Sequence, residues 1–436
     1  MYRYLSAILA LFVLTAPTSA GTLPYILGVQ IHHGTWVERP IYFVLPTVKA
    51  LLRFAFSSFR DDVGWAYFED GRPLALTRRL GALARVLNGT KGASRPLLIL
   101  TNGKPDFNNG ALPTTDAARA GFADFAERAM GEIAPYDPIV EIWNEWNLGT
   151  GTRSKRPGNP EDYVQLVKAT YPRLKAAFPG STFLVGALAT DLDPIPFLKR
   201  EWVWLGRAIE LGLLDNGDGL SVHLYNVCRP RHERRPSEQI RRMEALVELL
   251  DAAKPGANYP FYVTEVGWPE MMKGCGFTED EQISFSGQFL LWATKFPSLK
   301  GVWLYELKDS GVDPDNLEHH FGLLDFHYRP KPYFCGVSEA RTILDGARFV
   351  DERVGPGAQV ALSFDRSGDA VSAIWLAIAG DPVPFTVPDG AKARFLCETA
   401  TFKEGEQVLL RERPLIVSSG FGAFFAPMPT KAEADD

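Results

Sequence analysis

Short apolar segments alternate with amphipathic helical segments over most of this 436-residue chain, and that alternation is what most limits its possible folds. The apolar segments are rich in Val, Ile, Leu and Phe and show little polar alternation, as expected of parallel strands covered on both faces. We expect eight such strands, at residues 25–34, 51–59, 96–103, 139–146, 182–190, 219–226, 260–268 and 299–307.

The segments between these strands carry helical patterns. Residues 121–134 and 237–256 repeat apolar side chains at helical spacing, and residues 159–180 begin with Asn159 as an N-cap and Pro160 at the first helical position. Eight strand–helix units predict an α/β fold, the (β/α)8 TIM barrel. The alternative, a doubly wound open sheet, usually has a glycine-rich phosphate-binding turn after its first strand. The corresponding turn here, HHGTW, lacks that pattern.

Both ends of the chain depart from this pattern. After about residue 342, short strand segments with Gly or Asp-Gly turns every 8–12 residues predict a small antiparallel β-sandwich. At the N-terminus, Arg3, an apolar core at 4–16 and a small-residue site at 18–20 are typical of a secretory signal. We expect a signal peptide at 1–20, the catalytic barrel at 21–342, the β-sandwich at 343–428 and a disordered tail at 429–436.

The signal predicts a periplasmic or secreted protein. Its apolar core is short for a membrane span, which needs about 20 residues, so cleavage is favoured over an uncleaved anchor. The net charge of −6 argues against a nucleic-acid partner. The basic run at 229–242 is interpreted as a solvated loop and helix face rather than a polyanion patch. We expect a monomer that needs no cofactor and no metal.

Export permits disulfides, and the four cysteines allow three full pairings. Cys228 and Cys275 each follow the end of an expected strand, so they are candidates for a bridge between two loops at one rim. Cys335 and Cys397 could in turn tie the C-terminal region to the barrel. Their spacing does not match a zinc site.

Polar residues that close the barrel strands are the candidates for an active site, because such sites lie at the carboxyl ends of the strands. Glu145 and Glu265 close the fourth and seventh strands. Two carboxylates across a cleft are what glycoside hydrolysis needs. Adjacent Asn144 and Glu145 can both face the site only if the strand ends in a bulge or twist. Glu141, lying deeper, is interpreted as a buried structural acid paired with a base.

The motifs EIWNEWN (141–147) and FYVTEVGWP (261–269) resemble the acid/base and nucleophile strands of the clan A, or "4/7", retaining glycoside hydrolases. The segments LLRFAFSSF and SVHLYN, and the run from Tyr305 to Phe334, are similar to glycoside hydrolase family 39, especially its PslG-like bacterial exopolysaccharide glycosidases. The resemblance extends over nearly the whole chain.

The resemblance implies a role for each matching residue. Glu145 would be the general acid/base and Glu265 the nucleophile. Asn144 would bind the sugar 2-hydroxyl. Arg53 would lie beside Glu265, Tyr225 would donate to it, His223 would line the same wall and Trp303 would form the stacking floor. Asn102, which closes the third strand, is a further substrate-binding candidate because of its strand-end position.

Several alternatives remain open. Arg53 could instead be the partner of Glu141, and Tyr305 or Trp268 could replace Trp303 as the platform. Trp146 stands where many relatives have proline, which suggests a differently shaped subsite. The acidic and histidine-rich stretch at 309–320 is interpreted as a hydrogen-bonded rim loop rather than a calcium site. His32 and His33 are expected to shape a polar subsite.

The sequence thus predicts a metal-independent retaining glycoside hydrolase, acting by double displacement on a polysaccharide or oligosaccharide. Aromatic residues expected at the rim, Trp36, Trp65, Trp146 and Trp268, suggest a groove for endo-cleavage of a bacterial exopolysaccharide. The alternative is a non-hydrolytic periplasmic polysaccharide-binding protein that assists export.

Overall fold

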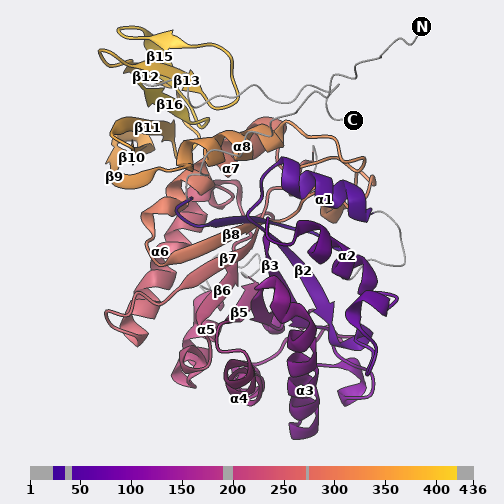
Figure 1. Cartoon of the computed structure of the whole chain (residues 1–436). Helices are drawn as coiled ribbons and strands as arrows, with labels where there is room; N and C mark the ends of the chain where they lie inside the picture. The colour runs from indigo at the N-terminus through magenta and orange to yellow at the C-terminus, as the bar shows by residue number, and fades with distance from the viewer. Residues whose placement is uncertain (1–22, 35–41, 190–199, 272–273, 420–436) are drawn as a thin grey trace, which may run out of the picture.

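Eight parallel strands close into a barrel, in the order β1 to β8, with β8 hydrogen-bonded back to β1 (Figure 1). The computed structural model describes residues 23–34, 42–189, 200–271 and 274–419. The expected signal peptide at 1–20, Trp36 and the expected tail at 429–436 lie outside them. The barrel strands are β1 Ile26–Gln30, β2 Ser58–Gly64, β3 Arg95–Thr101, β4 Ile139–Ile142, β5 Thr182–Ala189, β6 Gly219–His223, β7 Phe261–Val266 and β8 Leu299–Leu304.

Helices follow the strands and form the outer layer (Figure 1). Among the described residues, no helix is both long enough and apolar enough to cross a membrane. The Asn159 side chain accepts a hydrogen bond from the Asp162 backbone at 2.7 Å and so caps its helix as expected. The helices are α1 Val44–Arg53, α2 Gly81–Thr90, α3 Asp116–Ile133, α4 Pro160–Ala177, α5 Arg200–Glu210, α6 Pro236–Ala253, α7 Glu279–Trp292 and α8 Tyr333–Leu344.

The prediction of a second strand at 51–59 is wrong for most of that range. Its first three residues end α1, where Leu51 is buried while Leu52 and Arg53 are exposed. A helix buries one stripe and exposes the rest, so an apolar run there need not be a strand. Strand β2 begins only at Ser58, and its sequence, SFRDDVG, is polar.

The C-terminal region forms the expected antiparallel β-sandwich. A six-stranded sheet in the order β14-β13-β16-β11-β10-β9 is accompanied by a two-stranded sheet, β12-β15. The boundary falls between α8 and β9, close to the predicted residue 342. The strands are β9 Arg348–Gly355, β10 Gln359–Arg366, β11 Asp369–Leu376, β12 Val383–Thr386, β13 Lys392–Phe395, β14 Phe402–Lys403, β15 Gln407–Leu410 and β16 Leu415–Ser418.

The sandwich lies against α7 and α8 (Figure 1). Trp292 at the end of α7 packs edge-on against Trp375, with ring centroids 5.5 Å apart, and its Nε1 donates to Glu352 at 2.6 Å. A disulfide joins Cys335 on α8 to Cys397, with Cα atoms 5.9 Å apart. Apolar packing, a hydrogen bond and a covalent link therefore fix the sandwich to the barrel.

A second disulfide joins Cys228 and Cys275, the pair that the loop positions favoured. Their Cα atoms lie 4.8 Å apart. Cys228 follows β6 and Cys275 follows β7, so the bridge links two segments at the carboxyl rim of the barrel. It ties together the elements that carry Tyr225 and Glu265.

Replacing both Cys335 and Cys397 with serine should lower the free energy of unfolding by about 4 kcal/mol, because the bridge closes a long loop in the unfolded chain. The two cysteines are 62 residues apart. Urea unfolding of the oxidised proteins would measure the loss, and limited proteolysis should cut the sandwich first. Unchanged stability and proteolysis would contradict a clamping role for the bridge.

Candidate active site

A cavity of about 350 Å³ opens at the carboxyl ends of the barrel strands. Glu145, directly after β4, and Glu265, within β7, both line it. Asn144 and Tyr225 also line its wall, as expected. The two acids therefore face one space at the end of the barrel where active sites of this fold are found.

The separation of these two acids limits the chemistry that they can perform. One oxygen of Glu145, one of Glu265 and a ring nitrogen of His223 all lie within 4.8 Å of one another. Retaining glycosidases keep their two carboxyl groups about 5–5.5 Å apart, whereas inverting enzymes need about 6.5–9.5 Å for an intervening water. An oxygen-to-oxygen distance of no more than 4.8 Å is nearer to the separation of the retaining class than to that of the inverting class.

The chain turns sharply after β4 to present Asn144 and Glu145 together. Trp143 has φ 70° and Glu145 has φ 45°, both in the left-handed region. Each such residue costs about 1–2 kcal/mol, which the surroundings must offset. The twist that the sequence required of this strand end is thus a pair of left-handed residues.

Two buried tryptophans hold this turn. The Trp143 and Trp146 rings pack edge to face, with centroids 5.6 Å apart, and both are fully buried. Trp143 Nε1 donates to the Thr150 carbonyl at 3.1 Å, and Thr150 Oγ1 donates to Glu145 Oε2 at 3.0 Å. Trp146 Nε1 donates to the Asn159 carbonyl at 3.0 Å. The tryptophans therefore position the acid from behind.

The expectation that rim tryptophans line a groove is wrong for the three that the structure describes. Trp146 belongs to the core, so it does not shape a subsite. Trp65 and Trp268 are also buried, with exposed fractions of 1% and 0%. Trp65 stacks on Phe107, with ring centroids 4.9 Å apart. These three indoles therefore serve packing rather than sugar contact.

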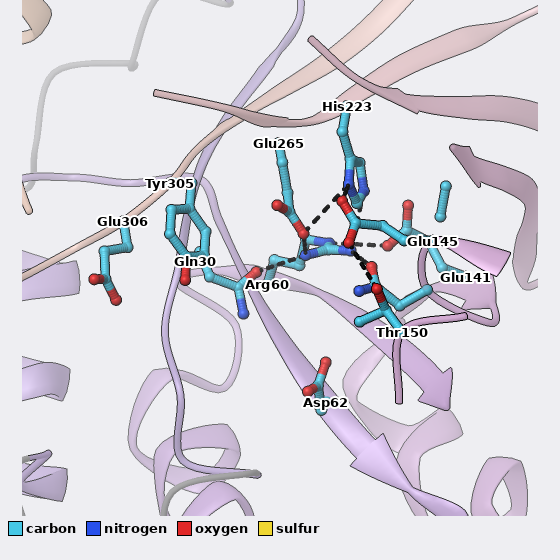
Figure 2. A network of polar contacts seen from close by, with 12 residues as sticks. Gln30, Arg60, Asp62, Glu141, Glu145, Thr150, His223, Glu265, Tyr305 and Glu306 are labelled. Carbon is cyan, nitrogen blue, oxygen red and sulfur yellow. Dashed lines mark hydrogen bonds and ion pairs between the residues drawn. The ribbon is translucent and has the colours of Figure 1, made fainter. Parts of the chain in front are cut away.

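Arg60 of β2 binds both Glu265 and the deeper Glu141 (Figure 2). Its Nη1 donates to Glu265 Oε1 at 2.5 Å, and its Nη2 donates to Asn144 Oδ1 at 2.8 Å. Its Nε donates to Glu141 Oε2 at 2.8 Å. Arg60 is 1% exposed and Glu141 fully buried. Glu141 is thus a buried acid paired with a base, as predicted.

The arginine predicted beside Glu265 was the wrong one. Arg53 is exposed at the end of α1, and the chain then enters the amino-terminal end of β2, so Arg53 lies at the opposite end of the barrel from the acids. Arg60 was missed because FRDD looks too polar for a buried parallel strand. Only the position of the strand could have identified Arg60, because a strand that begins at Ser58 directs the Arg60 side chain into the barrel interior.

Tyr225 and His223 contact the acids from β6 and the segment that follows it. Tyr225 OH donates to Glu265 Oε2 at 2.8 Å, so Arg60 and Tyr225 bind one Glu265 oxygen each. His223 Nδ1 lies 2.9 Å from Glu145 Oε1 and 3.6 Å from Glu265 Oε1. The imidazole therefore stands between the two candidate catalytic groups.

This arrangement shifts the proton affinity of the Glu145–His223 pair. Burial lowers the pKa of His223, but the charges of Glu265 and Glu145 outweigh burial and raise that pKa above its ordinary value. Burial raises the pKa of Glu145, but His223, Thr150 and Arg60 outweigh it and hold that pKa below its ordinary value. The proton of the pair therefore resides on His223 when the site is empty.

Two other substrate-binding predictions are wrong. Trp303 is fully buried in the barrel interior, where its Nε1 donates to Ser58 Oγ at 2.9 Å. A Cβ on Gly28 would lie 2.2 Å from the indole, so glycine there makes room for it. Tyr305, the residue directly after β8, lines the cavity instead. Asn102, at φ 67° beyond β3, lies outside the cavity lining.

Of the remaining residues named from the sequence, some line the cavity and others lie behind its wall. His32 lines the cavity, with its Nε2 2.9 Å from Glu306 Oε2, whereas His33 Nε2 bonds to Thr47 at 3.0 Å behind it. The stretch 309–320 is a hydrogen-bonded rim segment, in which His320 Nε2 lies 2.8 Å from the Asp313 carbonyl. Of its acids, Glu318 lines the cavity.

Comparison with known proteins shows that the fold of this chain is similar to that of several solved structures. No family model and no curated protein matches the sequence. A family 39 glycoside hydrolase from Bacteroides cellulosilyticus WH2 matches with a TM-score of 0.69 and 20% identity, over 91% of this chain and 81% of that one. The chain has the fold of the family 39 glycoside hydrolases.

Two further structures with this fold are similar over nearly their whole length. A family 39 enzyme from Xanthomonas axonopodis pv. citri has a TM-score of 0.58 and 15% identity, over 92% of this chain and 95% of that one. A monomeric β-xylosidase from Caulobacter crescentus CB15 has a TM-score of 0.57 and 12% identity, over 92% and 97%. The likeness therefore includes the barrel and the sandwich together.

Arg60→Ala should destabilise the protein by about 3–5 kcal/mol, because it leaves Glu141 buried without a cation. It should also abolish turnover, since Glu265 loses a donor. Arg53→Ala, at an exposed position, should change stability by less than about 0.5 kcal/mol. Denaturant unfolding and glycoside turnover of both variants would test this. Equal effects of the two substitutions would refute the reassignment.

Proposed function

We propose that this protein is a retaining glycoside hydrolase that acts on a polysaccharide or oligosaccharide. The observation that carries the proposal is the pair of carboxylates, Glu145 and Glu265, which line one cavity and have one oxygen each within 4.8 Å of the other. The same observation favours a hydrolase over a non-hydrolytic polysaccharide-binding protein, because a binder has no need of two acids at the catalytic spacing of a retaining enzyme.

In the first step, Glu265 attacks the anomeric carbon and the glycosidic C–O bond breaks. Glu265 has the two donors that a nucleophilic carboxylate needs for orientation, Arg60 and Tyr225. Glu145 delivers a proton to the departing oxygen, so that the leaving saccharide departs as a neutral alcohol. Asn144, which accepts a hydrogen bond from Arg60, would contact the 2-hydroxyl of the reacting sugar.

His223 supplies that proton through Glu145. The charge of Glu265 is the largest of the influences that raise the pKa of His223. As Glu265 forms its bond to the sugar, that charge disappears and the imidazolium becomes more acidic. The proton can then pass from Nδ1 to Glu145 Oε1, 2.9 Å away, and on to the leaving oxygen. Loss of one charge thereby triggers delivery of the proton.

In the second step, Glu145 acts as the base. It accepts a proton from water, the resulting hydroxide attacks the anomeric carbon, and the bond to Glu265 breaks with its electron pair returning to the carboxylate. Each of the two displacements inverts the anomeric carbon, so the product keeps the configuration of the substrate.

We further propose that the enzyme works outside the cytoplasm, as a monomer, on a bacterial exopolysaccharide. All four cysteines are paired in disulfides, which persist in oxidising compartments. Endo-cleavage stays a prediction, because the tryptophans first offered for a groove are buried where the structure describes them.

Removal of each carboxylate should affect activity in a different way. Glu265→Ala removes the group that forms the glycosyl intermediate, so turnover should fall below detection for every substrate. Glu145→Ala should retain the first step for an aryl glycoside with a good leaving group, and azide should rescue its turnover. For a β-linked substrate, the rescued product should be a β-azide, measurable by NMR.

Rescue of Glu265→Ala with an inverted azide product would exchange the two roles. Full activity in both variants would exclude the mechanism. Both variants should keep the wild-type circular dichroism and unfolding midpoint within a few degrees, which separates loss of chemistry from loss of fold.

The pH profile should report the proton on His223. Because the folded-state pKa of His223 is raised, its proton is present below pH 6.5 and is lost only above that value. The alkaline limb of kcat/KM should therefore lie above pH 6.5 in the wild type. In His223→Gln a carboxyl must hold the proton, so the limb should move to lower pH. An unmoved limb would contradict the transfer.

A further inference from the structure

The cavity carries more negative charge than the proposed mechanism uses. Four carboxylates line it, Asp62, Glu145, Glu265 and Glu318. The cations that line it are already engaged, since Arg60 binds Glu141 and Glu265 and His32 pairs with Glu306. His223, next to the cavity, pairs with Glu145. Asp62 and Glu318 remain without an ion-pair partner among the residues that the structure describes.

Asp62 has the position of a substrate contact. It lies two residues beyond Arg60 on β2, so both side chains project on the same side of the strand. Figure 2 shows it apart from the network around Arg60, with no bond drawn to its carboxylate. None of the described residues donates a hydrogen bond to that carboxylate. A partly buried charge in this situation lacks the partner that burial calls for.

Glu318 extends the negative lining toward the mouth of the cavity. It is exposed, and its one side-chain contact among the described residues is a 3.4 Å hydrogen bond from Tyr305 OH. Its carboxylate adds to the field inside a concave, low-dielectric space, which concentrates ions of opposite sign. A uronic acid or a phosphorylated sugar would meet repulsion on both sides of this space.

We infer that the substrate of this site is a sugar with a free, protonated amine, as in a de-N-acetylated hexosamine polymer, and that Asp62 binds its ammonium group. The inference rests on the proposed function, because it concerns the sugar in the same cavity. The ammonium would supply the missing cation and donate hydrogen bonds to Asp62.

The electrostatic surroundings of Asp62 fit such a ligand. Burial, with Glu265 and Glu141, outweighs Arg60 and His32 and raises the pKa of Asp62 to about 6. A bound ammonium would lower that pKa again, which means that the ionised carboxylate and the cation stabilise one another. A neutral hydroxyl would donate a hydrogen bond without relieving the excess of negative charge.

The test uses one oligosaccharide in two forms, a de-N-acetylated hexosamine oligomer and the same oligomer after chemical re-N-acetylation. Wild-type protein should bind and cleave the free-amine form at least about tenfold better, as a charge-assisted contact requires. Asp62→Asn keeps the size and an acceptor oxygen but loses the charge, so this preference should disappear. Asp251→Asn, exposed on α6, is the matched control and should retain it.

Binding by calorimetry and cleavage by product analysis separate the inference from the proposed function. Asp62-dependent binding of the free-amine form without cleavage would sustain the inference and sink the hydrolase. Cleavage of the N-acetylated form or of neutral glucans with no amine preference would sustain the hydrolase and overturn the inference. Failure to bind the free-amine form, or an equal loss on both forms in Asp62→Asn, would also overturn it.

Discussion

The guanidinium group of Arg60 is the contact on which the proposed active site depends. It binds Glu141 below, Glu265 at the reacting level, Asn144 beside the acid and Gln30 on the neighbouring strand. Its three nitrogens point in fixed directions, a geometry that a lysine cannot reproduce. A buried cation of this kind is costly unless several acceptors surround it. The same hydrogen bonds of Arg60 therefore both position the site residues and stabilise the buried charges.

The acids also depend on apolar packing behind them. The left-handed turn that presents Glu145 is unfavourable for the backbone by itself. Trp143 and Trp146 offset this by filling the space outside the barrel strands and hydrogen-bonding to the returning chain. The motif WNEWN thus combines two anchors with two functional groups. Its tryptophans look like sugar platforms in the sequence but belong to the core.

Much of the fold could be predicted, because the evidence for a barrel repeats along the chain. Six of the eight strands lie within the segments expected from apolar composition, and β3 begins one residue before its segment. Both glutamates face the cavity as their strand-end positions required. The second strand was misplaced because an apolar helix end, LLR, outweighed the polar strand SFRDDVG. That strand is polar because it supplies Arg60 and Asp62 to the cavity. Apolar composition therefore could not locate a strand that contributes two site residues.

The indole of Trp303 has a consequence for the order of events. Together with Tyr262 and a small apolar cluster, it fills the barrel interior beneath the acids. Saccharide and solvent must therefore share the opening at the carboxyl rim. In the proposed mechanism, the water of the second step has to arrive along the path by which the first product leaves. Because the barrel interior is filled, the leaving saccharide would have to depart before water can enter. A saccharide that stays in the cavity would instead attack the glycosyl-enzyme and re-form the glycosidic bond.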